Sequence, residues 1–290
     1  MKALTVATPT FNRAHTLPGV YESLCAQTDK NFIWLVIDDG STDNTAQLVE
    51  GWKNENIIEI EYVAKENGGK ASALNLGIGM LETPYAVCLD SDDSFYPGAV
   101  EKALSYLSEI EGDDSFCGIL ALRNNPDGTV MGKREIPAGT QRIKAEDIFL
   151  RWQLNTELIC FYKTGILKNY RFPEFPGEKF VSPAWMQYKI TEKYSYYPVW
   201  DKFCECEYVA DGLTRNKRKV IKKNPRGYTA VKKFSFDYSR GIKQIVKNGI
   251  MYDYGCLLGK IKDFHKDIKH PVWAVLLMPA ALIIKIIRKR

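Results

Sequence analysis

The sequence predicts an α/β fold in which a mostly parallel central sheet is flanked by helices, followed by a basic helical extension. Three observations predict it. Strand and helix patterns alternate through the first hundred residues, acidic and turn residues follow each strand, and Lys and Arg concentrate in the last quarter. A chain of 290 residues with 45% hydrophobic and 26% charged residues fits one large globular domain with an appendage.

The predicted elements follow one another in a regular order. Short apolar runs predict strands at 3–10, 32–39, 57–63 and 85–90, and helical spacing predicts helices at 16–27, 42–52 and 70–81. A cap at Ser41 or Thr42 is expected for the second helix. This alternation predicts parallel βαβ units with helices on both faces. In such sheets ligands bind at the carboxyl ends of the strands.

The segments that follow these strands are rich in acids and turn residues: TPTFNR, DDGSTD, KENGGK and DSDD. The sequence has no GxGxxG after the first strand and no GxxxxGK[ST], so neither a dinucleotide fold nor a Walker-type loop is indicated. A divalent cation, Mg²⁺ or Mn²⁺, can hold phosphate instead, because it prefers oxygen ligands. Asp90, Asp92 and Asp93 offer such oxygens, and three adjacent acids repel each other unless a cation compensates. The alternative is an acidic surface turn before a helix near Pro97.

The charge is unevenly distributed. Residues 214–290 hold 20 Lys and Arg against 4 Asp and Glu, a local charge of +16, whereas residues 1–213 carry −11. The end of the chain, PVWAVLLMPAALIIKIIRKR, is too short an apolar run, and too interrupted by Pro279, to span a bilayer. Residues 271–290 are therefore predicted to lie in the plane of an anionic membrane surface. A terminal helix packed on its own domain is the alternative, and no nucleic-acid partner is expected.

Two further patterns concern location. The opening MKALTVATPT contains polar Thr5, Thr8 and Thr10 and does not resemble a signal peptide, so we expect a cytoplasmic protein, peripheral to the inner face of the cell membrane. The seven cysteines are scattered and odd in number, which favours reduced thiols. The pair Cys204 and Cys206 lacks the second pair that a structural zinc site needs.

Four motifs resemble a known family. TPTFNR, VIDDGSTDNT, ENGGKASALNLGI and LDSDD, in this order and spacing, resemble the family 2 glycosyltransferases of GT-A fold, a Rossmann-like fold, over residues 3–100. FPEFPGEKF and YVADGLTRN extend a looser resemblance to bacterial polysaccharide-type members, to about residue 217. The resemblance implies inverting transfer of a sugar from a nucleotide diphosphate sugar, commonly a UDP-sugar, with Mn²⁺ or Mg²⁺. It divides the chain into a transferase domain at 1–217, with a nucleotide-sugar half at 1–100 and an acceptor half at 101–217, and a basic helical region at 218–290.

The resemblance also implies a set of donor contacts: Thr8, Pro9, Phe11, Arg13, Asp39, Lys70, Asp90, Thr214 and Arg215. Arg13 and Lys70 could instead be exposed charges at helix starts. Asp39 would accept the base N3–H, while Asp38 would orient the turn, Asp43 would be a turn or cap carboxylate, and Asn75 would support the glycine loop.

The catalytic residues implied are acidic. Asp92 is expected to bind the metal, Asp93 is a second ligand or a brace, and Asp90 meets the ribose or supports the metal indirectly. For the base that removes the acceptor proton, Glu178 leads, with Glu174 and Asp201 as further candidates. Where related sequences carry another acid after EKF, this chain has Val181 to Ala184, so Glu178 could also be a loop carboxylate paired with Lys179 or Arg171.

Three functions are thus compared. The first is a transferase that adds single sugars, because no QxxRW signature of processive synthases and no multispan region occur; a lipid-linked acceptor would share its membrane surface. The second is a non-catalytic nucleotide-sugar or carbohydrate-binding module on the same fold. The third, a phosphotransferase with an aspartyl nucleophile, is disfavoured because the first strand ends in Thr8, Pro9 and Thr10.

Overall fold

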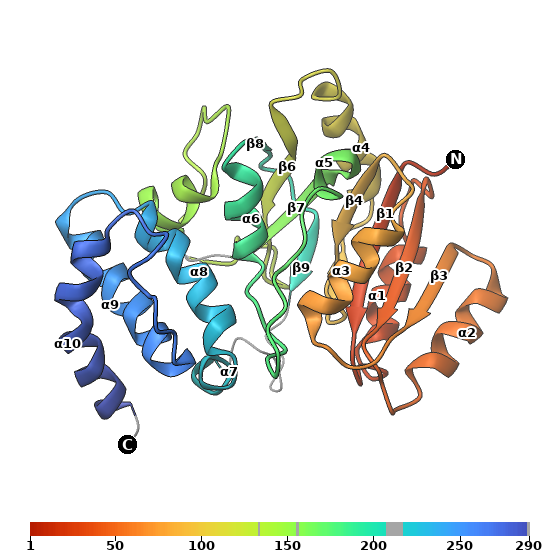
Figure 1. Ribbon diagram of the computed structural model, residues 1–290. Coiled ribbons are helices and arrows are strands. Elements are labelled where there is room, and N and C mark those ends of the chain that lie inside the picture. Colours follow the sequence, from red (N-terminus) through yellow and green to blue (C-terminus); the bar gives the residue numbers. More distant parts are fainter. Residues whose placement is uncertain (133, 155–156, 207–216, 289–290) are drawn as a thin grey trace.

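The computed structural model describes residues 1–132, 134–154, 157–206 and 217–288, and Figure 1 shows their arrangement. A seven-stranded sheet has the order β3-β2-β1-β4-β7-β6-β8. Its parallel part consists of β1 (Leu4–Thr10), β2 (Phe32–Asp38), β3 (Glu59–Ala64) and β4 (Tyr85–Cys88). Next to it, β7 (Leu158–Lys163) runs antiparallel to both β4 and β6 (Phe116–Leu122), and β8 (Ser195–Pro198) is parallel to β6.

Helices cover both faces of this sheet. Apolar side chains of α1 (Leu17–Cys25), α2 (Thr45–Glu55) and α4 (Ala99–Glu109) share one core cluster with the sheet. On the other face lie α3 (Lys70–Met80), the π-helix η1 (Asp147–Arg151), α5 (Thr164–Leu167) and α6 (Ala184–Thr191). The predicted α/β class with a mostly parallel sheet is therefore confirmed, and a sheet buried on both faces explains the near-continuous apolar strands.

One predicted helix start is wrong. The second helix begins at Thr45 rather than 42, and neither Ser41 nor Thr42 caps it. Both bond to Asn12 instead, which has a left-handed backbone with φ of 53°. The Asn12 amide donates to Ser41 Oγ at 2.8 Å, and the Thr42 amide donates to Asn12 Oδ1 at 2.7 Å. The two polar residues thus join the turns that follow β1 and β2.

A small second sheet follows the acidic motif. β5 (Asp93–Phe95) pairs antiparallel with β9 (Cys204–Cys206), with Asp93 opposite Cys206. This pairing brings the segment just before residue 207 onto the acidic motif. It also buries Asp93, which is only 5% exposed.

The C-terminal region is helical, as expected. It comprises α7 (Lys217–Lys223), α8 (Pro225–Asp237), α9 (Ile242–Gly259) and α10 (Pro271–Ile287), and it lies at the opposite end of the molecule from β3 (Figure 1). α8 contacts α6 and α9, and α10 packs on α9. Within the described residues, no helix has both the length and the apolar character that crossing a membrane requires.

Candidate functional site

The polar segments predicted at the strand ends do meet at one edge of the sheet. β1, β2 and β4 are neighbours in parallel register, with Thr10 opposite Asp38 and Ala7 opposite Cys88. Asp38 therefore ends β2, and Asp39 follows it, at the same edge at which Asp90 follows β4. A crevice at this edge is where an α/β sheet binds its ligand.

Asp90 lies between two cations. Lys70 Nζ is 2.5 Å from Asp90 Oδ1, and Arg123 Nη1 is 3.4 Å from Asp90 Oδ2. Burial opposes ionisation of Asp90, but the positive charges of Lys70 and Arg123 outweigh it and lower the pKa of this carboxyl. The alternative of a solvent-facing Lys70 is wrong, because its side chain is 26% exposed and ion-paired.

Asp93 forms an internal ion pair with Arg123. Its carboxylate forms a short ion pair with Arg123 Nη1, and both side chains are largely buried. Burial raises the pKa of Asp93, which the Arg123 guanidinium opposes. The prediction that Asp93 is a metal ligand does not fit this geometry, because a cation already occupies its bonding side. The alternative prediction of a brace does fit.

Asp92 differs from both neighbours. Its carboxylate is half-buried, and among the described residues it forms no ion pair. Burial and the nearby charge of Asp90 raise its pKa, whereas Arg13 and Lys70 oppose the rise. Of the three acids, Asp92 is thus the one without a paired cation within the described part of the chain.

The sequence did not single out Arg123. It ends the apolar run GILAL on β6, so a buried strand delivers a charge to the sheet edge as it does at Asp90. Its guanidinium also donates to the Leu158 carbonyl at 3.0 Å. The sequence signal for Arg123 is the same as for Asp90: an apolar run that predicts a buried strand is followed directly by a charged residue.

The glycine turn before α3 is held by Asp39. The amides of Gly68 and Gly69 donate to the Asp39 carboxylate at 2.9 and 2.6 Å, and Lys65 Nζ lies 3.0 Å from it. A carboxylate offers about four lone-pair sites, so roughly one remains for a base N–H. Gly69 has φ of 92°, and a Cβ there would lie 1.9 Å from the Lys179 carbonyl oxygen. The turn therefore requires glycine and packs directly on the second half of the chain.

The turn after β1 presents only part of the predicted nucleoside contact. The Thr8 side chain is fully buried and accepts a hydrogen bond from Trp34 Nε1 at 2.9 Å, so it points into the core. Pro9 is also buried, whereas Phe11 is 45% exposed. Arg13 is half-buried, and its charge acts on Asp92. Of the contacts predicted in this turn, Phe11 is thus exposed and Arg13 is partly exposed.

Three polar side chains hold loops in place. Asp38 accepts from the Ser41 amide at 2.7 Å and from Tyr62 Oη at 2.7 Å, and Asp43 accepts from the Ala14 amide at 3.0 Å and from Thr45. Both thus have the turn roles expected of them. Asn75 bonds the backbone of Phe172 in both directions rather than the glycine loop, so the expectation that it supports that loop is wrong.

The candidate bases are all engaged. Glu178 accepts the amides of Arg226 and Gly227, each at 2.9 Å, and so caps α8 rather than pairing with Lys179 or Arg171. Asp201 accepts from Lys102 at 2.7 Å and from Tyr106 at 2.6 Å. Glu174 accepts from Asn75 at 2.8 Å.

Two predicted donor contacts, Thr214 and Arg215, lie outside the described residues. Within the described ranges, no three His, Cys, Asp or Glu side chains form a group that could hold a metal ion.

Comparison with known proteins agrees with this arrangement. The family model described as Glycosyl transferase family 2 matches residues 5–171. An uncharacterized glycosyltransferase of Rickettsia felis is 41% identical over 106 residues, which are 37% of this chain and 17% of that protein. The putative teichuronic acid biosynthesis glycosyltransferase TuaG of Bacillus subtilis is 29% identical over 131 residues, or 45% of this chain and 51% of TuaG. The chain thus matches only a minor part of the Rickettsia felis relative's length.

Solved structures agree on the fold. S. aureus TarS 1-349 in complex with UDP-GlcNAc has a TM-score of 0.58 at 17% identity, covering 97% of this chain and 89% of that one. The mannosyltransferase PcManGT from Pyrobaculum calidifontis, in complex with GDP-Man and Mn²⁺, has a TM-score of 0.56 at 16% identity, covering 97% and 74%. At such identities the likeness concerns the fold, here that of GT-A glycosyltransferases. The family match over more than half of the chain, together with acids and cations converging at the carboxyl edge of its sheet, makes this chain a member of glycosyl transferase family 2.

Proposed function

We propose that the chain transfers a single hexose or N-acetylhexosamine, with inversion, from a nucleotide diphosphate sugar to a hydroxyl of a cell-surface or polyprenyl-linked glycan. The observation that carries the proposal is the Asp92 carboxylate, without an ion-pair partner among the described residues, beside Arg13 and Lys70 at the carboxyl edge of the sheet. The TarS complexes with UDP and with UDP-GlcNAc support a UDP-sugar donor. The name of TuaG supports a cell-surface polysaccharide product.

A divalent ion, Mn²⁺ or Mg²⁺, fits this site with one protein carboxylate, that of Asp92, among the described residues. Magnesium-type sites often use one or two carboxylates together with substrate phosphates and water, and Asp92 can supply one such carboxylate. When bound, the ion would stabilise negative charge on the departing diphosphate. Lys70 and Arg123 hold Asp90 in place beside it, and Arg13 offers a further positive charge to the phosphates.

Nucleoside binding is proposed at the turn after β1. Phe11 offers an exposed ring, and Asp39 retains capacity for a base N–H while it holds the glycine turn. Thr8 and Pro9 would act through the backbone, because their side chains are buried. Thr214 and Arg215 remain proposed contacts to the diphosphate.

The inverting reaction also needs a base on the acceptor side. Both carboxylate oxygens of Glu178 already accept backbone amides at the start of α8, so the side chain is held toward that helix. We therefore propose that Glu178 acts first as a positioning residue for the segment around it, and that any role as a base requires the cap on α8 to open.

Nucleotide-sugar hydrolysis tests the reaction. Purified protein is incubated with UDP-, GDP- and dTDP-sugars, with Mn²⁺ or with EDTA, as wild type and as Asp92→Asn. Slow release of one nucleotide, lost with EDTA and reduced at least about a hundredfold in Asp92→Asn, is expected. Asp114→Asn, at an exposed acid, is the matched control and should leave the rate unchanged.

Failure has a defined meaning in this assay. Donor binding by calorimetry with no release, even when glycan acceptors are added, would refute the transferase and favour a non-catalytic nucleotide-sugar or carbohydrate-binding module. Equal rates for Asp92→Asn and wild type would refute the role given to Asp92.

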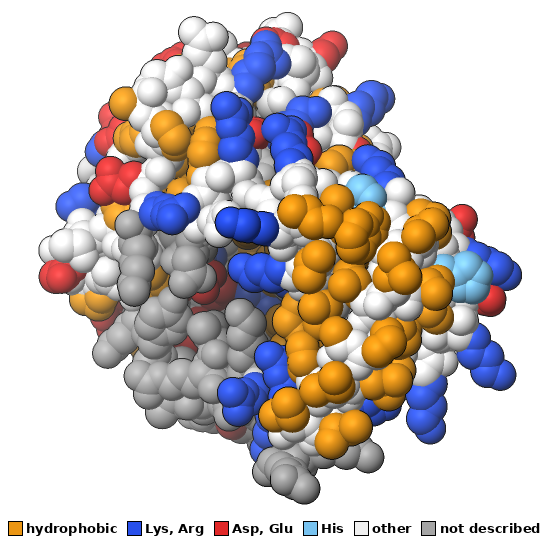
Figure 2. Space-filling view, turned by 90° about the vertical axis from the view of Figure 1, so that its left-hand side faces the viewer, with side chains coloured by type: hydrophobic (Ala, Val, Ile, Leu, Met, Phe, Trp, Pro, Cys, Tyr) orange, Lys and Arg blue, Asp and Glu red, His pale blue; other side chains and the backbone are white. Residues whose placement is uncertain are grey.

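We further propose that α10 docks on an anionic membrane, which would place the enzyme at the inner face of the cell membrane. One face of this helix packs inward through Ala274, Leu277 and Ala281, while its other face leaves large apolar side chains exposed: Val272, Val275, Leu276, Leu282, Ile283, Ile286 and Ile287. Figure 2 shows the apolar face, with Lys and Arg side chains along its borders. An apolar face rimmed by cations suits a surface of anionic lipids. The inward face of α10 thus packs on its own domain, and the proposal assigns its outward face to the membrane.

Vesicle flotation tests the docking. We expect binding to phosphatidylglycerol vesicles and little binding to phosphatidylcholine vesicles. The double variant Leu276→Glu with Ile283→Glu should weaken binding at least about tenfold, because each apolar side chain contributes roughly 1.5–3 kcal/mol when buried. Ile57→Glu, at an exposed isoleucine before β3, is the control. Unchanged flotation of the double variant would refute the docking face.

A further inference from the structure

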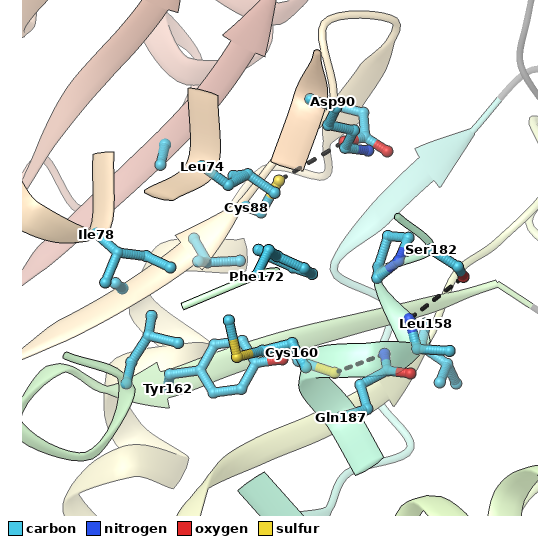
Figure 3. Close-up of a pocket in the computed structure, with 18 of the residues that line it drawn as sticks. Leu74, Ile78, Cys88, Asp90, Leu158, Cys160, Tyr162, Phe172, Ser182 and Gln187 are labelled. Carbon is cyan, nitrogen blue, oxygen red and sulfur yellow. Dashed lines mark hydrogen bonds and ion pairs between the residues drawn. The ribbon is translucent and has the colours of Figure 1, made fainter. Parts of the chain in front are cut away.

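An apolar cavity lies directly behind the acidic motif. It has a volume of about 220 Å³ and lies between the sheet, at β4 and β7, and the layer formed by α3 and α6. Its walls are formed mainly by Leu74, Ile78, Val87, Leu158, Cys160 and Met186. Figure 3 shows Asp90 and Ser182 on one side of this cavity and Ile78 and Tyr162 on the opposite side. Since Lys70, Asp90 and Arg123 also line it, the cavity adjoins the proposed donor site.

The interior of the cavity does not suit a sugar. It has few inner polar groups: Gln187 Nε2 donates to Cys160 Sγ at 3.7 Å, and the hydroxyls of Tyr162 and Tyr196 bond at 3.1 Å. Burial raises the pKa of Cys160 to about 11 and of Cys88 to about 12, as expected of thiols in apolar surroundings. A hydroxylated ring placed there would lose its hydrogen bonds to water and regain few.

The cavity is too large to be ordinary packing space. Protein interiors are packed as densely as organic crystals. An engineered apolar cavity of about 150 Å³ stays dry and binds benzene, so this one can hold an apolar group of six carbons or slightly more. The segment Ser182 to Ala184, which lines the mouth, has no carboxylate and adds no charge to it.

We propose that this cavity binds a short aliphatic group carried on a hydroxylated or phosphorylated head, with the head at Lys70 and Asp90 and the aliphatic group between α3 and α6. The inference rests on the proposed function, because the head lies where the transferred sugar would react. Two sources have this chemistry. One is an aliphatic portion of the acceptor, and the other is an acyl substituent on the donor sugar.

Calorimetry without turnover tests the proposal and separates the sources. In one arm, n-alkyl β-glucosides from methyl to heptyl are titrated below their micelle concentrations. In the other, UDP-glucose is compared with UDP-N-acetylglucosamine and longer N-acyl analogues. We expect affinity to rise about fourfold per methylene in one arm, and to stop rising beyond roughly six carbons. The arm in which it rises identifies the source.

Variants of residues that line the cavity test whether the dependence of affinity on chain length arises there. Leu74→Phe fills the cavity and should abolish the dependence on chain length, while Leu76→Phe, the same change on the other side of α3, should not. Cys160→Ala enlarges the cavity and should shift the plateau to a longer chain, which loss of folding could not produce.

Affinity that is independent of chain length in both arms would overturn the proposal, as would a dependence that survives Leu74→Phe. Because binding is measured without turnover, this failure differs from failure of the hydrolysis assay, which concerns the proposed function alone.

Discussion

Glu178 provides the sharpest test of how the site is built, because the structure gives it a different role from the base that the sequence favoured. Its two oxygens accept the amides of Arg226 and Gly227 at 2.9 Å each, at the second and third positions of α8. Losing a helix cap costs about 0.5–2 kcal/mol, and losing a negative charge at a helix N-terminus costs roughly 0.3–1 kcal/mol more. We therefore expect Glu178→Ala to lower the free energy of unfolding by about 2 kcal/mol and the Tm by about 3 °C.

The assay combines stability, exchange and kinetics. Thermal unfolding gives the Tm, and hydrogen exchange at Arg226 and Gly227 should become faster in Glu178→Ala but not in Glu82→Ala, an exposed control. As a capping residue, Glu178 should affect kcat by less than about tenfold and leave the pH profile unchanged. A loss of kcat of about 10²-fold or more, with the Tm and exchange unaltered, is what a general base would give and would refute the capping account.

Three further predictions concern buried charges and metal. Asp253 is fully buried, and neither carboxylate oxygen has a hydrogen-bond partner among the described residues. Burial raises its pKa from 3.8 to about 7, so its contribution to stability is present below pH 4 and is lost as the pH rises to 7. The upper bound is about 4 kcal/mol, and screening reduces it to about 2 kcal/mol. Because part of this contribution is already lost at pH 5, urea unfolding should show Asp253→Asn gaining about 1 kcal/mol on wild type between pH 5 and pH 8, and equal gains at both pH values would contradict it. Arg123→Met leaves Asp90 and Asp93 without that cation and should cost about 3–5 kcal/mol in the same assay, whereas a loss under 1 kcal/mol would show that the pairs contribute little. Mn²⁺ titrated alone should bind at least about tenfold more weakly than with UDP present, because the proposed site has Asp92 as its one carboxylate among the described residues and relies on phosphate oxygens, and equal affinities would mean a complete protein site.

The fold could be predicted from sequence because its information is local. Apolar runs that end in acids or turn residues define β1, β2 and β4, and their alternation with helices defines parallel connections. The start of α2 was predicted too early because Ser41 and Thr42 have the chemistry of caps, while their actual partner, Asn12, is 29 and 30 residues away. Capping preference is a local property that a tertiary hydrogen bond can override.

The sequence could predict which residues lie at the site, but not which partners they bind. Motif order correctly brought Asp39, Lys70 and Asp90 to one edge, but their partners depend on strands that join later in the chain. The sequence left Asp93 as either a second ligand or a brace, and the choice depends on the pairing of β5 with β9 and on Arg123, which directly follows β6. Asp92 lies in the turn before β5, whereas Asp93 is the first residue of β5 and pairs with Cys206, so the two carboxylates have different environments despite being neighbours in sequence.

Glu178 also belongs to a chain of contacts that connects Asp39 and the glycine turn to α8. Asp39 holds the amide of Gly69, which packs on the backbone of Lys179 so closely that no side chain fits between them. The Lys179 amide in turn donates to Asn224 Oδ1 at 2.7 Å, at the start of α8, where Glu178 supplies the cap. A shift of α8 therefore displaces the segment against which the glycine turn rests, and a packed interface transmits such a shift because it cannot deform freely. The two hydrogen bonds of Glu178 to the start of α8 thus join the helix to the segment on which the glycine turn packs.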